Sequence, residues 1–374
     1  DPAVKPDAAD ASDPSGSAFT RAGLPAHMVN AMRAAGLKRT TEIQRLAIPH
    51  LVAGEDVVIL AETGSGKTFA YALPMIAAVG APGRGGTKVQ GRCCPSMIVL
   101  VPNVELGRQV AYMAELAAEW VDTGEYPRPA GSKLAGDQEV IPEFRRAEVL
   151  VATPARLLAM MRDGWVLPGR IAHVVVDEAD EMLSRGFERE VAAVLETCYQ
   201  DDGVNKFGGT VQFCFAAATM AEEGPILSAF RRGPDGLRWV STAHFGGLHP
   251  QLKQRVREVH GVEDRRAALL RALAEDKTHR ALIFCASPEE ADACAEHCNA
   301  SGYVAMSFHG KTADRGVALD EFFNGDLPVL ACTDLAARGI DFPDLHHVVH
   351  YTPAADAATH LHRCGRTARV GQSG

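Results

Sequence analysis

Short, almost wholly apolar runs alternate with amphipathic stretches along most of the chain. A strand with one face in solvent alternates apolar and polar residues, so continuous apolar runs indicate strands covered on both faces, as in a parallel sheet. Between the runs, apolar residues recur at helical spacing, as in the segment from Leu106 to Trp120. Strands that alternate with helices predict an α/β fold with doubly wound parallel sheets. The apolar runs lie at residues 56–60, 97–101, 148–152, 172–176, 211–217, 237–241, 281–284, 304–306, 329–331 and 348–349.

The alternation breaks once, at residues 242–250 (TAHFGGLHP), where Gly, His and Pro replace the apolar pattern. A chain of 374 residues is also long enough for two domains. We therefore expect a first domain at residues 19–241, a linker at 242–250 and a second domain at 251–374, which looks short of a final strand or helix. Residues 1–18 contain almost nothing that a core could bury and are expected to be disordered.

Bulk composition narrows the class of protein. The apolar runs fall far short of the ~20 residues needed to span a bilayer, so no membrane insertion is expected. A net charge of −9 excludes a protein that is basic all over but leaves room for a local basic groove. Nine cysteines without framework spacing indicate reduced thiols and a protein that is not secreted. The chain begins at Asp1 without Met, so we expect a processed or trimmed form, in which a removed targeting peptide cannot be read.

A glycine-rich segment, Ala61-Glu62-Thr63-Gly64-Ser65-Gly66-Lys67-Thr68, lies between an apolar run and a helical stretch that starts near Phe69. Strand, glycine-rich turn and helix form the context that a phosphate-binding loop requires. Backbone N–H groups of the turn and of the helix N-terminus attract phosphate oxygens. Lys67 would reach the outer phosphates and the Thr68 hydroxyl would hold Mg²⁺. The first glycine of the usual pattern is Ala61 here. A turn that precedes a lysine by chance is the alternative, and the flanking strand and helix argue against it.

Carboxylates follow a second apolar run, at Asp177, Glu178 and Asp180. Asp177 could hold Mg²⁺ through water, because hard cations take oxygen ligands. Glu178 could orient or deprotonate an attacking water. An acidic cluster after a strand is usually a solvated helix start, but the phosphate loop about 110 residues earlier favours the catalytic interpretation.

The segment Thr41-Glu42-Ile43-Gln44 has the form of a capping box, in which Gln44 folds back on the Thr41 amide at a helix start. This local role is a sufficient explanation for Gln44. A preceding helix is expected to open at Leu24-Pro25 and to stop at Gly36.

With Asp177-Glu178-Ala179-Asp180 added, the chain resembles a DEAD-box ATP-dependent RNA helicase over almost all of residues 19–374, with the motifs in the family's order. The resemblance implies two RecA-like domains that use ATP and Mg²⁺. Phe19 and Gln44 resemble the adenine-reading Q motif, in which an aromatic ring stacks on adenine and the glutamine hydrogen-bonds its edge. Gln44 could therefore serve as cap, as reader, or as both.

Two stretches of the second domain extend the resemblance. Residues 332–341 (CTDLAARGID) resemble the motif that couples RNA contact to ATP, with Asp341 near the ribose. Residues 362–369 (HRCGRTAR) resemble the closing motif, in which Arg366 and Arg369 would be arginine fingers on the γ-phosphate. Arginines three residues apart could also mark an ordinary helix face. The resemblance assigns coupling of hydrolysis to strand separation to Asp180, Thr219 and His362.

RNA contacts in this family mostly grip sugar and phosphate, which gives affinity without sequence information. Recognition of the 2′-OH would favour RNA over DNA. The loop after His309 is two residues shorter than the family pattern, which affects the assignment of Arg315. The corresponding positions here are Pro102, Asn103, Gly136, Thr153, Arg156, Arg315 and Thr333.

Departures from the family pattern concentrate on the RNA and coupling side. Val104 replaces an arginine, Ala135 and Ala155 each replace a glycine, and Ala217 replaces a serine. The resemblance implies an RNA-stimulated ATPase that unwinds short RNA duplexes or remodels RNA–protein complexes. The alternative is an ATP-gated RNA clamp with little hydrolysis or unwinding, which Val104 and Ala217 favour and the retained nucleotide motifs oppose. A P-loop kinase or transporter ATPase would not explain the second domain.

Three short stretches resemble the branch of plant and algal DEAD-box proteins found in chloroplasts, which are associated with ribosomal RNA and large-subunit assembly. These are residues 101–104 (VPNV), 239–241 (WVS) and 249–254 (HPQLKQ). The resemblance implies a chloroplast location, in preference to a cytoplasmic or nuclear one. It also implies ribosomal RNA and ribosomal or assembly proteins as partners of a monomer.

One further cluster has the residue types of a metal site. Cys294, His297 and Cys298 share one face of a predicted helix that starts near Pro288. A fourth ligand at metal spacing is absent from the sequence around them. Buried thiols are therefore the favoured interpretation.

Overall fold

The computed structural model describes residues 17–79, 92–119, 132–134, 147–183, 186–198, 210–220, 236–243, 245–248, 252–275, 280–342 and 345–367. Most of the segment expected to be disordered lies outside these residues, but Ser17 and Ala18 already belong to helix α1, Ser17–Arg21. No helix of the described ranges is both long and apolar enough to cross a membrane. The chain divides into two compact units between Phe245 and Gly246, within the stretch expected to be the linker.

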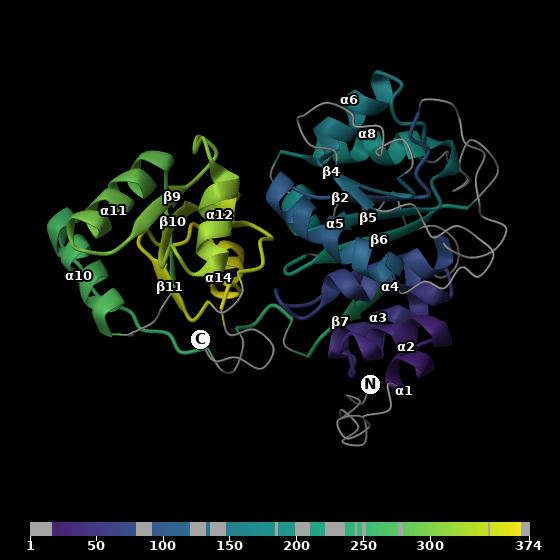
Figure 1. The fold of residues 1–374 in the computed structure, drawn as a ribbon, viewed down its shortest axis with the longest axis horizontal. Helices are drawn as coiled ribbons and strands as arrows, with labels where there is room; N and C mark the ends of the chain where they lie inside the picture. Colours follow the sequence, from purple (N-terminus) through teal and green to yellow (C-terminus); the bar gives the residue numbers. More distant parts are fainter. Residues whose placement is uncertain are drawn as a thin grey trace. The chain divides into compact units, whose positions relative to one another are not determined.

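The first domain is built on a seven-stranded parallel sheet in the order β3-β4-β2-β5-β6-β1-β7 (Figure 1). Six of its strands coincide with predicted apolar runs, and their parallel pairing confirms the predicted sheet type. The three-residue strand β3 was not predicted, because its sequence SKL is too short and too polar to form an apolar run. The strands are β1 Val57–Leu60, β2 Met97–Leu100, β3 Ser132–Leu134, β4 Val149–Ala152, β5 His173–Asp177, β6 Gln212–Ala217 and β7 Arg238–Ser241.

Helices cover both faces of this sheet, as the continuous apolar strands require (Figure 1). Successive strand residues face opposite sides, so Val57 and Ile59 join one core while Val58 and Leu60 join the other. The first core includes residues of α1 to α5 and the second includes residues of α6 to α8. The remaining helices are α2 Ala26–Ala34, α3 Glu42–Val52, α4 Lys67–Val79, α5 Val104–Glu119, α6 Pro154–Arg162, α7 Ala179–Met182 and α8 Glu188–Cys198, with a 3-10 helix η3 at Pro168–Arg170.

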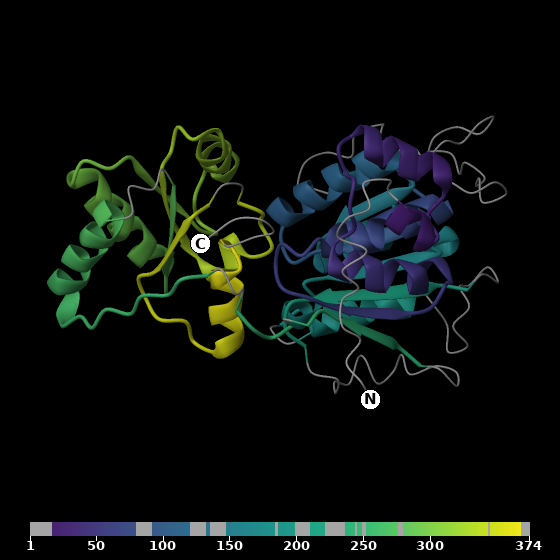
Figure 2. The ribbon, with the colours of Figure 1, turned by 90° about the horizontal axis from the view of Figure 1, so that it is seen from below.

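The second domain repeats this plan with a four-stranded parallel sheet in the order β11-β8-β10-β9. Helices α10 and α11 pack in the core on one face, and α12 and α13 pack on the other (Figure 2). Edge strand β11 is half-buried and lies beside α14. The elements are β8 Ala281–Cys285, β9 Ala305–Phe308, β10 Val329–Thr333, β11 His347–His350, α10 Gly261–Glu275, α11 Pro288–Ala300, α12 Arg315–Asn324, α13 Asp334–Ala337 and α14 Ala357–Cys364.

Candidate active site

The carboxyl edge of the larger sheet collects the predicted nucleotide-binding groups. Strands β1, β6 and β5 are neighbours, with Leu60 paired to Ala217 and Asp177 paired to Ala216. The phosphate loop follows β1, the carboxylates end β5, and Thr219 follows β6. Because all three strands are parallel, these groups emerge at one edge, where ligands of open α/β sheets bind.

The phosphate loop depends on glycine at two positions. Gly64 and Gly66 have φ of 83° and 94°, a left-handed conformation that side chains rarely adopt. A Cβ on Gly66 would also lie 2.6 Å from Gln44 Nε2. Helix α4 begins at Lys67, so the amides of its first turn face the loop, which is the arrangement that binds phosphate.

Lys67 and Ser65 present polar atoms to this loop. Lys67 is buried and its Nζ donates a 2.7 Å hydrogen bond to the carbonyl of Ala61. Ser65 Oγ is buried and has no hydrogen-bond partner among the described residues. An ammonium on a neutral carbonyl can move to a charged phosphate oxygen, which is a stronger acceptor. The loop therefore suits an oxygen-rich anionic ligand.

Both oxygens of the Asp177 carboxylate are oriented by hydrogen bonds. Oδ2 accepts from the Tyr71 hydroxyl at 2.8 Å, and Oδ1 accepts from the Glu178 amide at 3.0 Å. Burial, and next the charge of Glu178, raise the pKa of Asp177 to about 6, against the opposing effects of Tyr71 and Lys67. Burial and the Asp177 charge also raise the pKa of Tyr71 well above its ordinary value. A buried carboxylate beside a loop that carries the Thr68 hydroxyl suits a hard cation such as Mg²⁺.

The sequence interpretation missed Tyr71. It lies four residues after Lys67 on α4, so both side chains share one helix face. The spacing from Lys67 could have indicated that Tyr71 faces the site. Its bond to Asp177 could not be read from the sequence, because the two residues are 106 positions apart.

Glu178 has a left-handed backbone, with φ 49° and ψ 48°. Among the described residues it is the only non-glycine with positive φ. This conformation costs about 1–2 kcal/mol for an L-residue. It turns the chain sharply from β5 into α7, with the Glu178 side chain buried at the strand end.

Gln44 joins helix α3 to the phosphate loop. Its side-chain Oε1 accepts from the backbone N–H of Thr41 at 3.0 Å, and its backbone N–H donates to Thr41 Oγ1. These two bonds confirm the predicted capping box. In addition, Gln44 Nε2 donates to the Gly66 carbonyl at 3.2 Å. Phe19 is 2% exposed and belongs to the core of the first domain, so its stacking on adenine stays a prediction.

The predicted coupling residues Asp180 and Thr219 are in direct contact. Asp180 Oδ2 accepts from both the amide and the hydroxyl of Thr219, at 2.8 and 2.7 Å. The acidic segment after β5 is thereby tied to the segment after β6. His362 lies in α14 of the second domain.

Most positions predicted to contact RNA in the first domain follow strands β2 and β4, which pair at Leu100 and Ala152. Asn103 Oδ1 accepts from the Leu106 amide at 2.8 Å and so caps α5. Thr153 is the N-cap of α6 without a side-chain capping bond. Arg156 Nε is buried without a hydrogen-bond partner in the described part of the chain. Pro102 is buried next to Asn103, and Gly136 lies outside the described residues.

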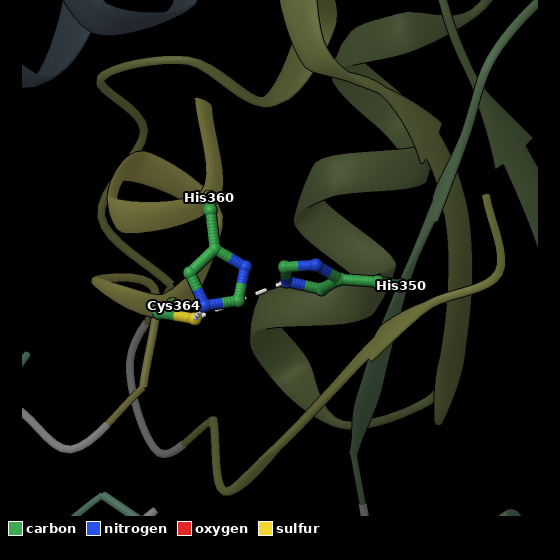
Figure 3. A group of neighbouring side chains, drawn as sticks. All are labelled: His350, His360 and Cys364. Atoms are coloured by element: carbon green, nitrogen blue, oxygen red, sulfur yellow. Dashed lines mark hydrogen bonds between the residues drawn. The ribbon is translucent and has the colours of Figure 1, made fainter. Parts of the chain in front are cut away.

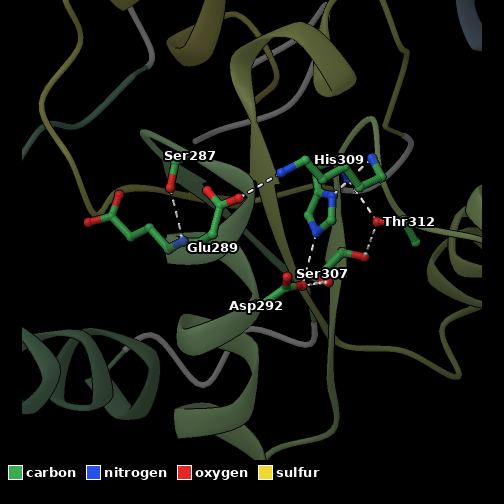
Figure 4. A network of polar contacts seen from close by, with 8 residues as sticks. Ser287, Glu289, Asp292, Ser307, His309 and Thr312 are labelled. Atoms are coloured by element: carbon green, nitrogen blue, oxygen red, sulfur yellow. Dashed lines mark hydrogen bonds and ion pairs between the residues drawn. The ribbon is translucent and has the colours of Figure 1, made fainter.

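In the second domain a hydrogen-bond network fixes the loop that precedes Arg315 (Figure 4). The Lys311 amide donates to His309 Nδ1 at 3.2 Å, so the ring proton is on Nε2, which donates to Asp292 Oδ1 at 2.9 Å. The Ser307 hydroxyl donates to the same carboxylate oxygen. The bond from His309, then that from Ser307, lower the pKa of Asp292. The sequence interpretation missed Asp292, which lies on helix α11, whereas His309 follows strand β9.

The other second-domain positions lie at element ends. Arg315 begins α12 with its guanidinium 5.4 Å from the Phe308 ring centroid, and Thr333 is the N-cap of α13. Asp341 is exposed.

Arg366, a predicted arginine finger, is held by two backbone carbonyls. Its Nη1 donates to the Ile340 carbonyl at 2.7 Å and its Nε donates to the His362 carbonyl at 3.1 Å. Arg369 lies outside the described residues.

Arg363 lies within the closing motif, but no role was assigned to it from the sequence, and it makes several charge-assisted polar contacts. Its guanidinium donates to both oxygens of Asp334, at 2.6 and 2.8 Å, and to the Thr352 carbonyl at 2.6 Å. A fork of this kind is stronger than two independent neutral hydrogen bonds. It joins α14 to α13 and to the segment after β11.

The cysteines agree with the favoured interpretation. All nine are free, and eight of them are buried. Cys294 hydrogen-bonds with Cys285 and Cys298 within the core. The bond with Cys285, together with burial, raises the pKa of Cys294 above the ordinary thiol value, against the opposing effect of the bond with Cys298. His297 belongs to neither of the metal-capable side-chain groups found among the described residues.

Two known protein-family profiles match the chain, one in each domain. A profile of the DEAD/DEAH box helicase family covers residues 41–225, and a profile of the helicase conserved C-terminal domain covers residues 264–371. The ATP-dependent RNA helicase dbp2 of Aspergillus oryzae is 31% identical over 373 residues, which cover 95% of this chain and 62% of the relative. The dbp2 of Emericella nidulans is 30% identical, with 95% of this chain and 61% of the relative covered.

A solved structure of a variant of S. cerevisiae Dbp5 bound to RNA and ADP BeF3 has a TM-score of 0.77 at 25% identity, covering 95% of this chain and 87% of that one. The chain spans about 62% of the length of the curated dbp2 relative from Aspergillus oryzae. The two profiles together span most of the chain, and each falls on one of its two α/β domains. The chain belongs to the DEAD/DEAH box helicase family.

Proposed function

We propose that this chain is an RNA-stimulated ATPase that uses hydrolysis to open short RNA duplexes or to remodel RNA–protein complexes. The observation that carries the proposal is the buried Asp177 carboxylate, oriented by Tyr71 from the helix that also carries Lys67. The names of the dbp2 relatives and the RNA bound to the Dbp5 structure support RNA as the partner.

The side chains of the first domain divide the chemistry among them. Lys67 would leave the Ala61 carbonyl for the outer phosphates, while amides of the loop and of the first turn of α4 bind phosphate oxygens. Thr68 and Asp177 would hold Mg²⁺, which when bound neutralises charge on the transferred phosphoryl group. Glu178 would orient the attacking water and accept its proton on a carboxylate oxygen. Asp180 and Thr219, which hydrogen-bond to each other after β5 and β6, would couple hydrolysis to RNA strand separation.

The finer parts of the proposal rest on sequence resemblance. We place the protein in the chloroplast, on ribosomal RNA, as a monomer that works with ribosomal or assembly proteins. Residues 101–104, 239–241 and 249–254 support this placement. The arginine-finger roles of Arg366 and Arg369 belong to the same set of predictions.

The test is steady-state ATP hydrolysis with and without single-stranded RNA. The Glu178→Gln variant should lose about 10²–10⁴-fold in kcat, because it removes the proton acceptor. Glu196→Gln, on the exposed face of α8, is the matched control and should behave like the parent. No RNA stimulation, together with an unchanged rate in Glu178→Gln, would refute the enzymatic proposal.

A second assay separates a helicase from an RNA clamp. An ATP-gated clamp is favoured by Val104, an apolar residue at the start of α5 among positions predicted to grip RNA. A labelled short RNA duplex should be released in the presence of ATP if the chain remodels RNA. Retention of RNA with a non-hydrolysable ATP analogue, without duplex release under ATP, would instead identify the clamp.

A further inference from the structure

Three metal-capable side chains converge in the second domain (Figure 3), and one of them, Cys364, belongs to the closing motif at residues 362–369 without a role assigned from the sequence. His350 ends strand β11, and His360 and Cys364 lie four residues apart on α14, so both point from the same helix face. Cys364 Sγ lies 3.5 Å from His360 Nε2 and 4.0 Å from His350 Nε2. The three ligand atoms all lie within 4.8 Å of one another.

These separations fit a tetrahedral ion. With metal–sulfur and metal–nitrogen bonds of about 2.3 and 2.0–2.1 Å, sulfur and nitrogen ligands of one zinc ion lie about 3.6 Å apart. The two observed sulfur–nitrogen distances bracket this value, so small side-chain rotations would complete the site. The imidazole rings meet at 71°, with centroids 5.0 Å apart, and do not stack over each other.

Hydrogen bonding offers the same cluster a single thiol proton. It can serve His350 Nε2 if His360 Nε2 instead donates to Gln254 Oε1 at 3.2 Å, and the sulfur–nitrogen separation to His350 is then a long 4.0 Å. A cation shared by one thiolate and two neutral imidazoles satisfies all three ligand atoms at once.

The charge of a neighbouring guanidinium, Arg363, is offset in part by the carboxylate on which it is forked. Burial, and next Arg363, lower the pKa of His350, whereas Asp334 raises it, and Arg363 and Asp334 are paired with each other. Gln254 Oε1 lies 3.2 Å from His360 Nε2, so an amide oxygen is at hand for the remaining coordination position. His350 and His360 are only partly buried, which gives an ion a way in.

We propose that His350, His360 and Cys364 bind one Zn²⁺ ion, with Gln254 Oε1 or water as the fourth ligand. Thiolate and imidazole ligands select a borderline-soft ion over Mg²⁺, which prefers oxygen. The ion would tie the end of β11 to the last turn of α14. That turn leads directly into Gly365 and Arg366, so the ion would fix the segment that carries the predicted arginine finger.

The test uses the full chain, stripped of metal with a chelator in a thiol-free reductant and kept in excess Mg²⁺ to occupy oxygen-ligand sites. Added Co²⁺ should give a thiolate-to-cobalt charge-transfer band in the near ultraviolet and tetrahedral visible bands, saturating at one ion per chain. Zn²⁺ should displace the cobalt and raise the melting temperature of the chain. These readouts need no ATP, so they can fail without affecting the proposed function, and the reverse also holds.

Cys364→Ser should abolish the charge-transfer band, and His360→Ala should weaken Zn²⁺ binding by at least the 10–100-fold typical of supporting residues. Cys94→Ser, a half-buried thiol of the first domain, is the matched control and should keep the band. Near-ultraviolet circular dichroism of each metal-free variant checks folding, and the less buried His360 supplies a second variant if Cys364→Ser unfolds. No band, a band that survives in Cys364→Ser, or an equal rise in melting temperature in all variants would overturn the proposal.

Discussion

The carboxyl edges of the two sheets hold their polar side chains in different ways. At the larger sheet the hydrogen bonds run between segments with predicted nucleotide or coupling roles, as in Lys67 to Ala61, Gln44 to Gly66 and Thr219 to Asp180. At the smaller sheet the partners are carboxylates that had no role assigned from the sequence. Asp334 holds Arg363 and Asp292 holds His309.

This difference separates two kinds of constraint. The first edge is organised for a ligand. Its buried Asp177 carboxylate, and a Ser65 hydroxyl that has no hydrogen-bond partner among the described residues, are costly without one. The second edge is held by complete ion pairs and hydrogen bonds of its own. We therefore expect substitutions at the second edge to act mainly on stability, and substitutions at the first edge to depend on pH and nucleotide.

The largest expected effect is the loss of the Arg363 fork. Arg363→Ala should lower the unfolding free energy of the second domain by about 3–4 kcal/mol, because it leaves Asp334 without its partner. Arg363→Lys keeps the charge but not the two-pronged geometry and should lose less. Arg271→Ala, which removes an exposed pair with Asp264, is the control and should change stability by less than about 1 kcal/mol.

Urea unfolding followed by two signals can assign this loss to a domain. All three tryptophans, Trp120, Trp165 and Trp239, belong to the first domain, so fluorescence follows that domain alone. Far-ultraviolet circular dichroism follows both domains. The comparison fails if Arg363→Ala shifts the fluorescence transition as much as the dichroism transition.

The next effect tests the ligand-dependent edge through pH. Burial raises the pKa of Asp177 to about 6 from an ordinary 3.8, so between these values the native state keeps a proton that the unfolded state has lost. The unfolding free energy of the nucleotide-free, metal-free chain should therefore fall as pH rises from about 4 to about 6. At 1.36 kcal/mol per pKa unit, the loss from this one group is about 2–3 kcal/mol.

Asp177→Asn isolates this contribution, because the amide does not titrate. Its unfolding free energy minus that of the parent should increase from pH 4 to pH 7, whatever the fixed cost of the substitution. Unfolding by urea at a series of pH values measures the difference. A difference that stays constant with pH would show that Asp177 titrates normally, and that this edge is not held in wait for a cation.

Local patterns made much of the fold predictable. Continuous apolar runs predicted six strands of the larger sheet, and five of these are buried on both faces, whereas edge strand β7 is buried only at Val240. The capping box was readable because Thr41 and Gln44 are three residues apart, so the pairing needs only one helical turn. By contrast, the Tyr71–Asp177 bond joins residues 106 positions apart and depends on which strands become neighbours.

The metal-capable cluster shows the same limit. Helical spacing indicated Cys294, His297 and Cys298, which share α11, but the two cysteines pack in the core of the domain. His360 and Cys364 have equally suitable spacing on α14. Their third partner, His350, comes from a strand, and its approach depends on how α14 lies beside β11. Sequence spacing can therefore supply two ligands of such a site, whereas the third requires tertiary structure.

The smallest expected effect concerns two glycines of the first domain that share a left-handed backbone but differ in their surroundings. Gly54 has φ of 82°, and no atom of the described residues lies within 4 Å of the place of its Cβ, whereas a Cβ on Gly66 would meet Gln44 Nε2. Alanine at Gly54 should cost about 1–2 kcal/mol from backbone strain alone. Alanine at Gly66 should cost about 1 kcal/mol more, because Gln44 must give up a hydrogen bond to make room.

A double-mutant cycle decides whether Gln44 is the cause of this extra cost. If it is, Gln44→Ala should destabilise the Gly66→Ala chain less than it destabilises the parent, since the contact between the two sites is already lost. The same substitution in the Gly54→Ala background should have its full effect. Additive costs in both backgrounds would mean that the link from Gln44 to the phosphate loop contributes no stability, and that the capping box alone accounts for Gln44 in the nucleotide-free chain.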